Sequence, residues 1–399
     1  MKRSYCLLLV LLCCTALYGQ DSLNVRNVIY YTLPETTRHV VVSDTLAHIV
    51  NGDYYILNVA NPYQPQQLGY LSFGGVAQKV RVRDSNSYIV DYYGKFYAIT
   101  IQDPSNPGVL GEYILYGHAY DLSISGNLAC IANGSRGMRI LDLFDIGNIL
   151  EIGHYSTSSP CVGVLTSENL AYLACGTGGV YILNISNPYS PSLLAFYDTP
   201  GFAISLFLED TLLHVADREN GLLLLNVSNP SSPALVGEYP SSGCTYEIYA
   251  ADSIIYVADY NGGFRVLNAQ YLPNIVEIGY YDTPGYAYSV HEESGYIYVA
   301  DGAPGLGIFE LCESNLSEVF RKQTKNIIVS GANAITLDLI LPGLPYTATL
   351  YSANGTLISR GSSDGTEKLE IKIPGKIGIY FLVIEYESSR HFSRIVKIR

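Results

Sequence analysis

Apolar and polar positions alternate along most of the chain in short blocks of strand length. Runs of four to six residues rich in Val, Ile, Leu and Tyr are separated by turns that contain Gly, Pro, Asn and Asp. The turns include D-T-P-G at 198–201 and N-P-S-S-P at 229–233, both typical of loops. Between residues 193 and 234 the pattern predicts β-strands at 194–197, 203–208, 212–216 and 222–227. It indicates an all-β unit without a helix.

The same block recurs at one fixed interval. The stretch VYILNISNPYSP at 180–191 closes one copy, and its Asn184 has evenly spaced counterparts at Asn58, Thr100, Asp142, Asn226, Asn268 and Glu310. Four strands per unit at about 40-residue spacing are typical of a β-propeller with one sheet per blade around a central channel. The sequence therefore predicts seven blades, from the copies 25–66, 67–108, 109–150, 151–192, 193–234, 235–276 and 277–318.

An open solenoid is the alternative fold, and it would need polar caps at both ends. The first and last copies look like the middle ones, which favours a closed ring. The sequence leaves open whether the two ends of the propeller share one blade. Most copies end in a pair of prolines, but the third has Ile146 and Ile149 there and the sixth has Leu272 and Ile275. We expect these two loops to be the least regular.

The closing strand of each repeat carries a family resemblance. It appears as MRILDL from Met138, LLLLNV from Leu222 and FRVLNA from Phe264, with YVAD at Tyr256 and Tyr298. Together with the phrases LLNVSNP and DTPG[FY]A, these segments resemble the LVIVD repeat family across the whole predicted propeller. The resemblance implies a propeller of bacterial or archaeal surface proteins and no defined reaction. Several copies depart from the family by Asn or Thr in place of its Asp.

Residues 1–19 have the parts of a secretory signal peptide. A basic start at 2–3 precedes an apolar run at 7–12 and a plausible cleavage region at 16–19, before Gln20. The apolar run is shorter than the ~20 residues that a membrane-spanning helix needs, which disfavours an anchor. Two cysteines leave a lipoprotein open, although neither follows the small residue normally found before a lipid-modified Cys. The segment predicts a secreted or cell-surface protein without a transmembrane segment.

The sign of the charge changes along the chain. Residues 21–318 hold 30 acidic and 10 basic side chains, whereas 319–399 hold 6 acidic and 11 basic ones. An acidic body argues against a nucleic-acid partner, because phosphate neutralisation needs Lys and Arg. The change coincides with the end of the repeat. We therefore predict a signal peptide at 1–19, a propeller at 20–318 and a C-terminal domain at 319–399.

Sheet-like alternation continues in the C-terminal domain without the period of the repeat. The Asn354-Gly355 pair between two apolar runs is a strong β-hairpin signal. A small antiparallel β-sandwich fits a segment of this size. The pattern predicts its strands at 327–330, 334–339, 347–352, 357–360, 368–373, 378–386 and 391–398.

Three segments of this domain resemble a secretion signal. ATLYSANGTLIS from Ala348, GIYFLVIE from Gly378 and FSRIVKIR from Phe392 are similar to the type A sorting domain of the type IX secretion system. The resemblance implies export by that machinery across the outer membrane of a Bacteroidota-type bacterium, removal of the domain and often attachment to surface lipopolysaccharide. An ordinary accessory sandwich is the alternative. The matched motif residues are Asn354, Gly355, Gly378, Tyr380, Phe381 and Lys397.

One polar position recurs at the start of a hairpin loop in the repeats. Such side chains on one rim could attract cations or hydrogen-bond sugar hydroxyls. A Gly four residues later in most copies favours a structural role instead, in which the side chain caps turn amides. With Cys175 in the seventh copy, the candidate ring is Asn51, Asp91, Asn133, Asp217, Asp259 and Asp301.

Loop tyrosines are the other candidates for ligand contact. Their rings could stack on sugars or anchor a protein partner; they are Tyr63, Tyr92, Tyr93, Tyr189, Tyr260 and Tyr286.

The sequence predicts no cofactor and no metal site. It contains no CxxC, HxH or HExxH spacing, no G-x-S-x-G elbow and no phosphate-binding loop, so no catalytic residue is predicted. The favoured hypothesis is a non-enzymatic binding scaffold for glycan or protein. The alternative is an extracellular hydrolase or lyase acting on polysaccharide, with carboxylates or Tyr from different blades near the channel.

Overall fold

The computed structural model describes residues 22–311 apart from 75 and 252. In the C-terminal part it describes the segments 327–330, 335–339, 346–352, 357–363, 369–373, 378–386 and 389–398. The chain divides into two compact units, Met1–Cys312 and Glu313–Arg399. The predicted signal peptide and the predicted boundary at 318/319 lie outside the described residues. In the part of the chain described, no helix is long and apolar enough to cross a membrane.

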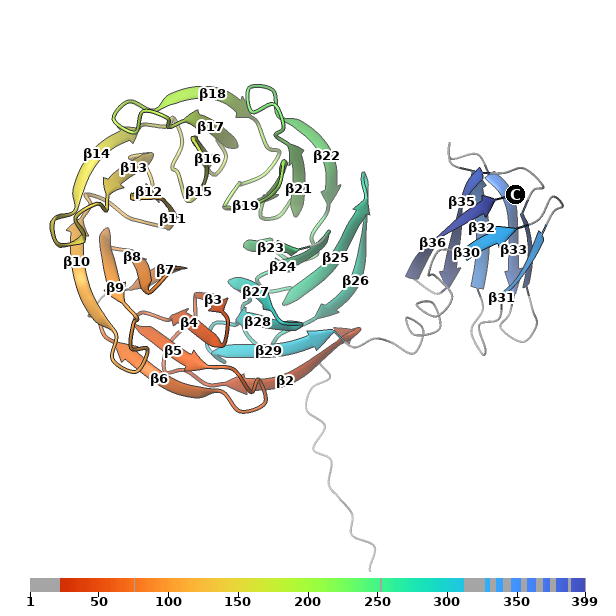
Figure 1. Cartoon of the computed structure of the whole chain (residues 1–399), viewed down its shortest axis with the longest axis horizontal. Helices are drawn as coiled ribbons and strands as arrows, with labels where there is room; N and C mark the ends of the chain where they lie inside the picture. The colour runs from red at the N-terminus through yellow and green to blue at the C-terminus, as the bar shows by residue number, and fades with distance from the viewer. Residues whose placement is uncertain are drawn as a thin grey trace, which may run out of the picture. The chain divides into compact units, whose positions relative to one another are not determined.

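The first unit is the predicted seven-bladed propeller (Figure 1), and each blade contains a four-stranded antiparallel arrangement. The innermost strands surround the channel: β3 (His39–Ser43), β7 (Ala77–Arg83), β11 (Asp121–Ser125), β15 (Gly163–Ser167), β19 (Ser205–Glu209), β23 (Glu247–Ala251) and β27 (Ser289–Glu293). The second strands are β4 (Leu46–Val50), β8 (Asn86–Asp91), β12 (Leu128–Ala132), β16 (Leu170–Ala174), β20 (Leu212–Ala216), β24 (Ile254–Ala258) and β28 (Tyr296–Ala300).

The outer half of each blade has the same regularity. The third strands are β5 (Tyr54–Asn58), β9 (Lys95–Thr100), β13 (Met138–Asp142), β17 (Val180–Asn184), β21 (Leu222–Asn226), β25 (Phe264–Tyr271) and β29 (Leu306–Leu311). The outermost strands are β6 (Gln66–Leu71), β10 (Gly108–Ile114), β14 (Leu150–Tyr155), β18 (Ser192–Tyr197), β22 (Ala234–Tyr239), β26 (Asn274–Tyr281) and β2 (Val25–Tyr31). A short strand, β1 (Ser22–Leu23), adds a fifth strand beside β26.

The blades are offset by one strand from the repeats read in the sequence. The first strand of each repeat pairs with the last strand of the preceding repeat and becomes the outer strand of that blade, as β18 does with β17. The N-terminal strand β2 therefore completes the last blade by pairing with β29. This answers the question that the sequence left open: both ends of the propeller share one blade. Hydrogen bonds between strands distant in sequence close the ring and remove two free edges.

The core lies between neighbouring blades rather than within one. The face of β16 and β17, with Tyr172 and Ile182, packs on Leu206 and Val215 of the next blade, and equivalent clusters recur around the ring. The blades approach closely at their rims, where a Cβ added to Gly153 would lie 1.9 Å from the carbonyl oxygen of Pro188. Only Gly allows the outer strand to meet the neighbouring turn so closely.

The two loops expected to be irregular are so. In the third copy the Pro-type turn is replaced by a 3₁₀ turn, η1 (Ile146–Asn148), which Asp145 caps by accepting a hydrogen bond from the Gly147 amide. In the sixth copy β25 and β26 are each eight residues long and pair as far as Tyr271 and Asn274. Without the proline pair, the strands extend into the connection.

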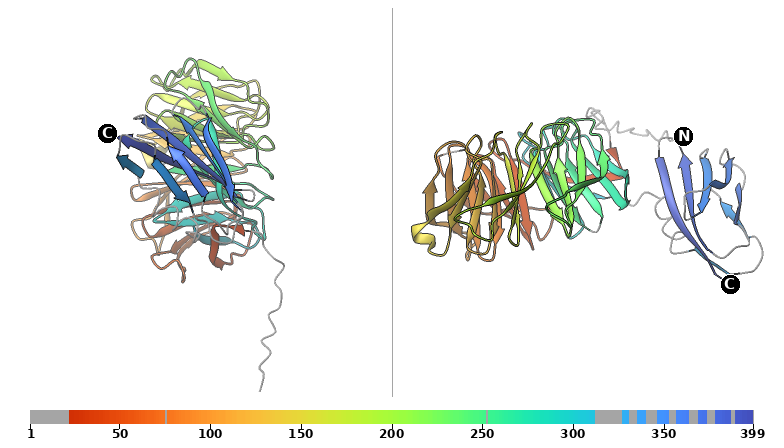
Figure 2. Two further views of the ribbon diagram at one scale, coloured as in Figure 1. Left: turned by 90° about the vertical axis from the view of Figure 1, so that its right-hand side faces the viewer. Right: turned by 90° about the horizontal axis from the view of Figure 1, so that it is seen from above.

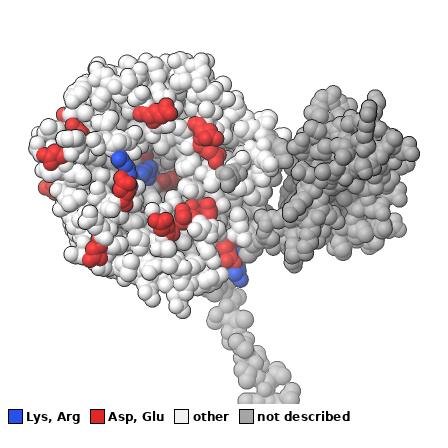
Figure 3. Space-filling view, viewed as in Figure 1, with Lys and Arg blue, Asp and Glu red and all other residues white. Residues whose placement is uncertain are grey.

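Strand direction defines two faces of the propeller, whose blades stand side by side in the lateral views of Figure 2. On the funnel face, the chain enters each innermost strand and the loops join second to third strands. On the hairpin face, short turns join the innermost to the second strands and the N-P-x-x-P turns join the third to the outermost strands. Acidic side chains are spread around the central hollow on the face drawn in Figure 3, with basic ones at its edge.

The second unit contains the seven predicted strands. A five-stranded sheet has the order β30 (Ile327–Ser330), β36 (Ser389–Ile398), β35 (Gly378–Tyr386), β32 (Tyr346–Ser352) and β33 (Leu357–Ser363). The strands β31 (Ile335–Leu339) and β34 (Leu369–Ile373) form a separate antiparallel pair. One contact differs from the expected antiparallel sandwich, because β30 and β36 run parallel.

Candidate functional site

The candidate site is a cavity of about 690 Å³ at the funnel-face end of the channel, which we call the channel mouth. Its wall includes one residue at or next to the start of each innermost strand. Five of these seven residues are aromatic or apolar, one is Arg and one is Gln: Arg38, Gln78, Tyr120, Val162, Ile204, Tyr246 and Tyr288. The blades therefore place unlike side chains at equivalent points of one wall.

We call the residue that follows each of these wall residues the first position of its innermost strand. Three of the seven first positions, Lys79, Asp121 and Ser205, line the floor of the channel mouth. Each first position pairs with the last or next-to-last residue of its second strand, so the seven are structurally equivalent. They are His39, Lys79, Asp121, Gly163, Ser205, Glu247 and Ser289. Six of the seven are polar, on strands whose other positions include many buried aliphatic residues.

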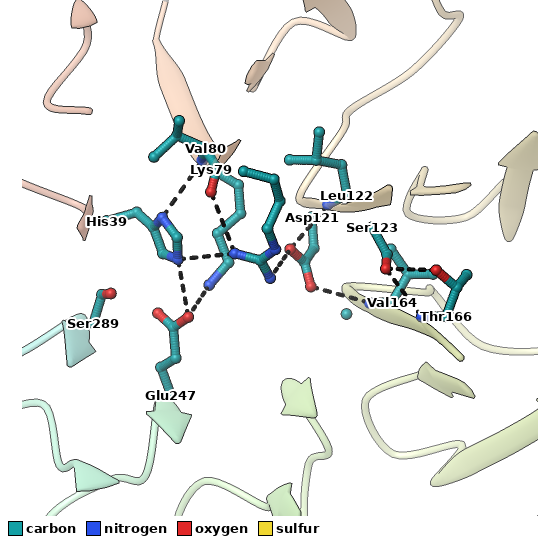
Figure 4. A network of polar contacts seen from close by, with 12 residues as sticks. His39, Lys79, Val80, Asp121, Leu122, Ser123, Val164, Thr166, Glu247 and Ser289 are labelled. Atoms are coloured by element: carbon teal, nitrogen blue, oxygen red, sulfur yellow. Dashed lines mark hydrogen bonds and ion pairs between the residues drawn. The ribbon is translucent and has the colours of Figure 1, made fainter. Parts of the chain in front are cut away.

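Four first positions and Arg81 form a charged network across the channel (Figure 4). The Glu247 carboxylate, on β23, lies 2.8 Å from the Lys79 ammonium and 3.0 Å from Nε2 of His39. Lys79 and His39 belong to strands β7 and β3 of two other blades. The Arg81 guanidinium lies beside the same His39 nitrogen, at 3.1 Å, and 3.2 Å from Oδ1 of Asp121. Four blades are thus connected through side chains.

The network fixes the protonation of its members. Burial, together with the Lys79 and Arg81 cations, lowers the pKa of His39 to about 3 although Glu247 opposes them, so the imidazole is neutral at pH 7. Its Nδ1 accepts a hydrogen bond from the Val80 amide at 3.4 Å, so Nε2 carries the proton and donates it to Glu247.

Glu247 is ionised in this environment. Burial alone would raise the pKa of this carboxyl group, but His39, Lys79 and Arg81 outweigh burial and lower it. A Glu with a lowered pKa does not hold a proton near neutral pH, so it is a poor general acid.

The first positions also join neighbouring blades through the main chain. Oδ2 of Asp121 accepts a hydrogen bond from the Val164 amide of the next blade at 3.1 Å. The hydroxyl of Ser289 does the same for the Val40 amide at 3.3 Å, across the blade junction where the ring closes. Part of the polarity around the channel is therefore structural, because it satisfies main-chain amides of the innermost strands across blade junctions.

Aromatic rings line and flank the channel mouth on two sides. Tyr246 stacks on Tyr260 with centroids 5.2 Å apart, and Tyr260 stacks on Tyr286 at 4.4 Å, so the three rings form a series from the cavity wall outward. On the other side, Tyr92 stacks on His118 at 4.2 Å. Of the predicted loop tyrosines, Tyr92 thus lines the cavity, and Tyr260 and Tyr286 stack outward from its wall on the other side.

The other predicted loop tyrosines lie elsewhere. Tyr63 and Tyr189 belong to the N-P-x-x-P turns on the hairpin face and are exposed, at 48% and 68%. Tyr93 is on the funnel face and is also exposed, but it does not line the cavity. The six residues therefore do not form one surface.

The structure places the candidate ring in buried positions where each loop leaves its second strand. The carboxylates of Asp217, Asp259 and Asp301 each accept a hydrogen bond, at 2.8–3.0 Å, from the glycine amide of the loop that enters the innermost strand of the same blade. Asp91 accepts one from the Lys95 amide in its own loop. None of the four lines the cavity. The remaining two members, with the same burial, are Asn51 and Asn133.

Other predicted residues belong to the C-terminal unit. Gly378, Tyr380 and Phe381 lie on β35, and Lys397 on β36 pairs with Gly378. The strands on both sides of the expected hairpin, β32 and β33, pair antiparallel; its turn residues Asn354 and Gly355 lie outside the described residues.

Among the residues described, no group of three or more His, Cys, Asp or Glu side chains could hold a metal ion. Cys130, Cys161 and Cys175 are buried free thiols and Cys244 is a half-buried one.

Solved structures support the fold. The chain is similar to the computationally designed protein Ika8, with a TM-score of 0.54 and 9% identity, over 71% of this chain and 99% of that one. It is also similar to the WD40 repeats of RRP9, with a TM-score of 0.59 and 10% identity over 73% and 100%. A third similar chain comes from the mitotic checkpoint complex, with a TM-score of 0.59 and 11% identity over 72% and 90%.

Sequence comparison gives the family. A search of curated proteins found no match. The LVIVD repeat model matches residues 74–114, 116–157, 162–199, 200–241 and 284–327, which together make up more than half of the chain. The seven-bladed ring and these matches agree, and the chain belongs to the LVIVD repeat family.

Proposed function

We propose that this protein is a secreted or surface-displayed binding propeller without enzymatic activity, and that its ligand enters the channel mouth. The observation that carries the proposal is the cavity of about 690 Å³, walled by aromatic and cationic side chains that differ from blade to blade. This volume is typical of ligand sites, which combine apolar walls with a few placed polar groups. A wall needed only for packing would repeat the same side chains in every blade.

The charged network supports binding over catalysis. A polysaccharide hydrolase would need a carboxylic acid that keeps its proton near neutral pH, and a lyase would need an unpaired base. The Glu247 carboxylate is paired with Lys79 and the Asp121 carboxylate with Arg81, and the pKa of Glu247 is lowered. The enzyme alternative predicts release of new reducing or unsaturated ends from an incubated polysaccharide, and binding without such release is the expected result.

Closing the cavity tests the proposed site. In a screen of glycans and proteins with the mature chain, the substitution Val162→Trp should abolish binding, because an indole at this wall position occupies the channel mouth. Val109→Trp is the matched control, since Val109 lies on an outer strand and is 49% exposed. Ligands bound equally by the Val162→Trp variant and the wild type would place the binding surface elsewhere.

Export is the second part of the proposal. The signal-like segment 1–19 and the similarity of the C-terminal strands to a type A sorting domain support a route through the periplasm and then the outer membrane. Deleting residues 322–399 should leave the propeller in the periplasm, as measured by fractionation and by protease treatment of intact cells. Surface display of the shortened chain would contradict the sorting role and leave the binding proposal untouched.

A further inference from the structure

The channel mouth has an excess of unpaired positive charge. Its lining includes the charged side chains of Arg38, Lys79, Asp121 and Arg218. Lys79 pairs with Glu247, and Asp121 pairs with Arg81. Among the described residues, no ion pair joins Arg38 or Arg218 to a carboxylate.

This charge is unusual for the chain that carries it. Residues 21–318 contain only 10 basic side chains against 30 acidic ones, yet three of the ten line this one cavity. If the basic side chains were spread evenly over the surface, three of them would not line the same cavity. Two guanidinium groups without carboxylate partners, in a partly enclosed site, attract an anion more strongly than they would in open water.

Arg218 occupies a position that the fold reserves for glycine in three other blades. Its φ is +47°, in the left-handed region, and the equivalent residues Gly134, Gly176 and Gly302 also have positive φ. A side chain in this region costs on the order of 1 kcal/mol relative to Gly, and such strain concentrates at functional sites. Tyr260 holds the same position in its own blade, with φ +49°. Two side chains at the funnel face are thus kept against local backbone preference.

The Arg218 guanidinium is held in place by aromatic rings. It lies 4.7 Å from the ring centroid of Phe202 and 5.5 Å from that of Tyr246, whose hydroxyl accepts a hydrogen bond from Nη2 at 3.4 Å. Arg38 lies 5.9 Å from the centroid of Tyr288. Stacking of this kind orders a cation without neutralising it, because the ring carries no net charge.

The mouth suits sugars better than peptides. The main-chain groups of the loops around it hydrogen-bond to each other, through bridges such as Gly176 with Ala203 and Arg218 with Thr245. An extended peptide would therefore find no free strand edge to join. Tyr246 and Tyr288 line the cavity and are half-buried, so the parts of their rings that the neighbouring Arg and Tyr side chains leave exposed, together with their hydroxyls, suit the apolar faces and hydroxyl edges of a sugar.

We propose that the channel mouth binds an anionic saccharide, whose carboxylate or sulfate groups pair with Arg38 and Arg218 and whose ring faces pack on the tyrosines. This inference rests on the proposed function, because it names the ligand of the same cavity. A carboxylated and a sulfated sugar share the chemistry that the two guanidinium groups recognise, since each presents two or more oxygens to the planar donors.

The test compares charged saccharides with their neutral counterparts. Isothermal titration calorimetry of the mature full chain would use oligogalacturonate and its methyl ester, and a sulfated galacto-oligosaccharide and its desulfated form. We expect one of the two charged sugars to bind at least tenfold more tightly than its neutral counterpart, with an affinity that falls as salt rises. The pair that shows the difference identifies the anionic group.

The other outcomes overturn the inference. Equal affinity for charged and neutral forms would remove the anionic specificity while the cavity stays a binding site. Binding of poly-glutamate and of no saccharide would assign the mouth to an acidic peptide. Binding of none of these probes also overturns the inference. The screen that compares Val162→Trp with the wild type then tests separately whether the channel mouth binds any ligand.

Charge variants locate the contact. Arg38→Gln and Arg218→Gln should each weaken binding of the charged saccharide about tenfold or more and leave the neutral form unchanged. Arg136→Gln is the control, because it removes one charge from an exposed loop residue on the same face that does not line the cavity. Arg218→Gly uses the residue found in three sister blades, so it should fold normally and show the same loss. Unchanged affinity in both Arg218 variants overturns the assignment.

Discussion

The third strands and the innermost strands of the propeller obey opposite rules, although both are repeated seven times. At the middle of the third strands, seven equivalent residues are aliphatic and fully buried: Ile56, Ala98, Ile140, Ile182, Leu224, Val266 and Ile308. The first positions of the innermost strands include His, Lys, Asp, Gly, Ser and Glu. The uniform third-strand residues give every blade the same packing, whereas the first positions give the blades side chains of several kinds at the channel.

The difference has a physical origin. A third strand lies between neighbouring blades, where every side chain must fill the same gap at close packing density. A first position lies at the end of the channel, where it is mostly buried but meets side chains from several blades instead of one repeated surface, so several side chains are accepted as long as their polar groups are paired. The comparison therefore separates residues that specify the fold from residues that are free to specify a ligand.

The largest effect is expected from a third-strand substitution. Leu224→Ala removes buried methyl groups and leaves a cavity between two blades, which should reduce the free energy of unfolding by about 2–5 kcal/mol. Urea titration measures this loss. Binding by the folded fraction should not change, since Leu224 does not line the channel mouth.

A matched control is available on the neighbouring strand. Leu235 lies on β22 and is 44% exposed, so Leu235→Ala should change stability by about 0.5 kcal/mol or less. Similar losses for Leu224→Ala and Leu235→Ala would mean that packing between blades does not distinguish the two positions.

A smaller loss is expected at a first position. Glu247→Gln leaves the Lys79 ammonium without its carboxylate and replaces the anionic acceptor of the His39 proton with a neutral amide oxygen. Breaking a fully buried pair costs about 3–5 kcal/mol, but the Lys79 side chain is 13% exposed at the cavity, so we expect about 2 kcal/mol. Glu238→Gln, on an exposed part of β22, should have almost no effect.

The pH dependence gives the same substitution a second test. Because the folded-state pKa of Glu247 is lowered, its stabilisation is present above the unfolded-state pKa of about 4.5 and is lost as the pH falls below it. The difference between wild type and the Gln variant should therefore shrink in acid. A difference that stays constant from pH 7 to pH 3 would show that the carboxylate charge contributes nothing.

Much of the fold could be read from the repeat, because packing between blades imposes one period on the sequence. The number of blades, their four strands and the two irregular loops all follow from it. The closure could not be read, since the pairing of β2 with β29 joins the two ends of the propeller, whose sequences look like any other strand pair. The same holds for the one-strand offset between repeats and blades.

The site was harder to predict because its residues come from different blades, and the repeat does not show which of them meet. Tyr92, which lines the cavity, and Tyr260 and Tyr286, which stack beside it, could be selected from the sequence because aromatic residues are conspicuous in turns, and their role in binding stays a prediction. The charged network was missed, although three of its members, Lys79, Asp121 and Glu247, share one phase of the repeat.

A fourth first position in the network, His39, falls outside that phase. His39 belongs to the blade with the shorter connection between the second and third strands, where Val50 pairs with Tyr54 while its counterpart Ala132 pairs with Met138. The shorter loop moves His39 out of register with the other first positions. Its equivalence to them therefore shows only in the strand pairing, in which His39 lies opposite Val50.

The candidate ring should show its effect chiefly as a pH dependence, and its members resemble the third strands in burial and the first positions in polarity. Asp301 accepts hydrogen bonds from the Gly285 amide and the Tyr30 hydroxyl, and burial raises its pKa to about 6. The folded state then binds more protons than the unfolded state between about pH 4 and pH 6. The contribution of Asp301 to stability is therefore greatest in acid and is lost as the pH rises through 6.

The substitution Asp301→Asn should remove this dependence, since an amide cannot ionise but still offers one oxygen to the same donors. Subtracting the variant's unfolding free energies from those of wild type should give a difference that falls by about 1 kcal/mol per pH unit between pH 4 and pH 6 and then levels off. Asp91→Asn is the comparison within the ring, as this carboxylate caps its own loop. A difference that rises with pH would mean that Asp301 is paired with a cation in solution, and the ring would then belong with the charged first positions rather than with the buried framework.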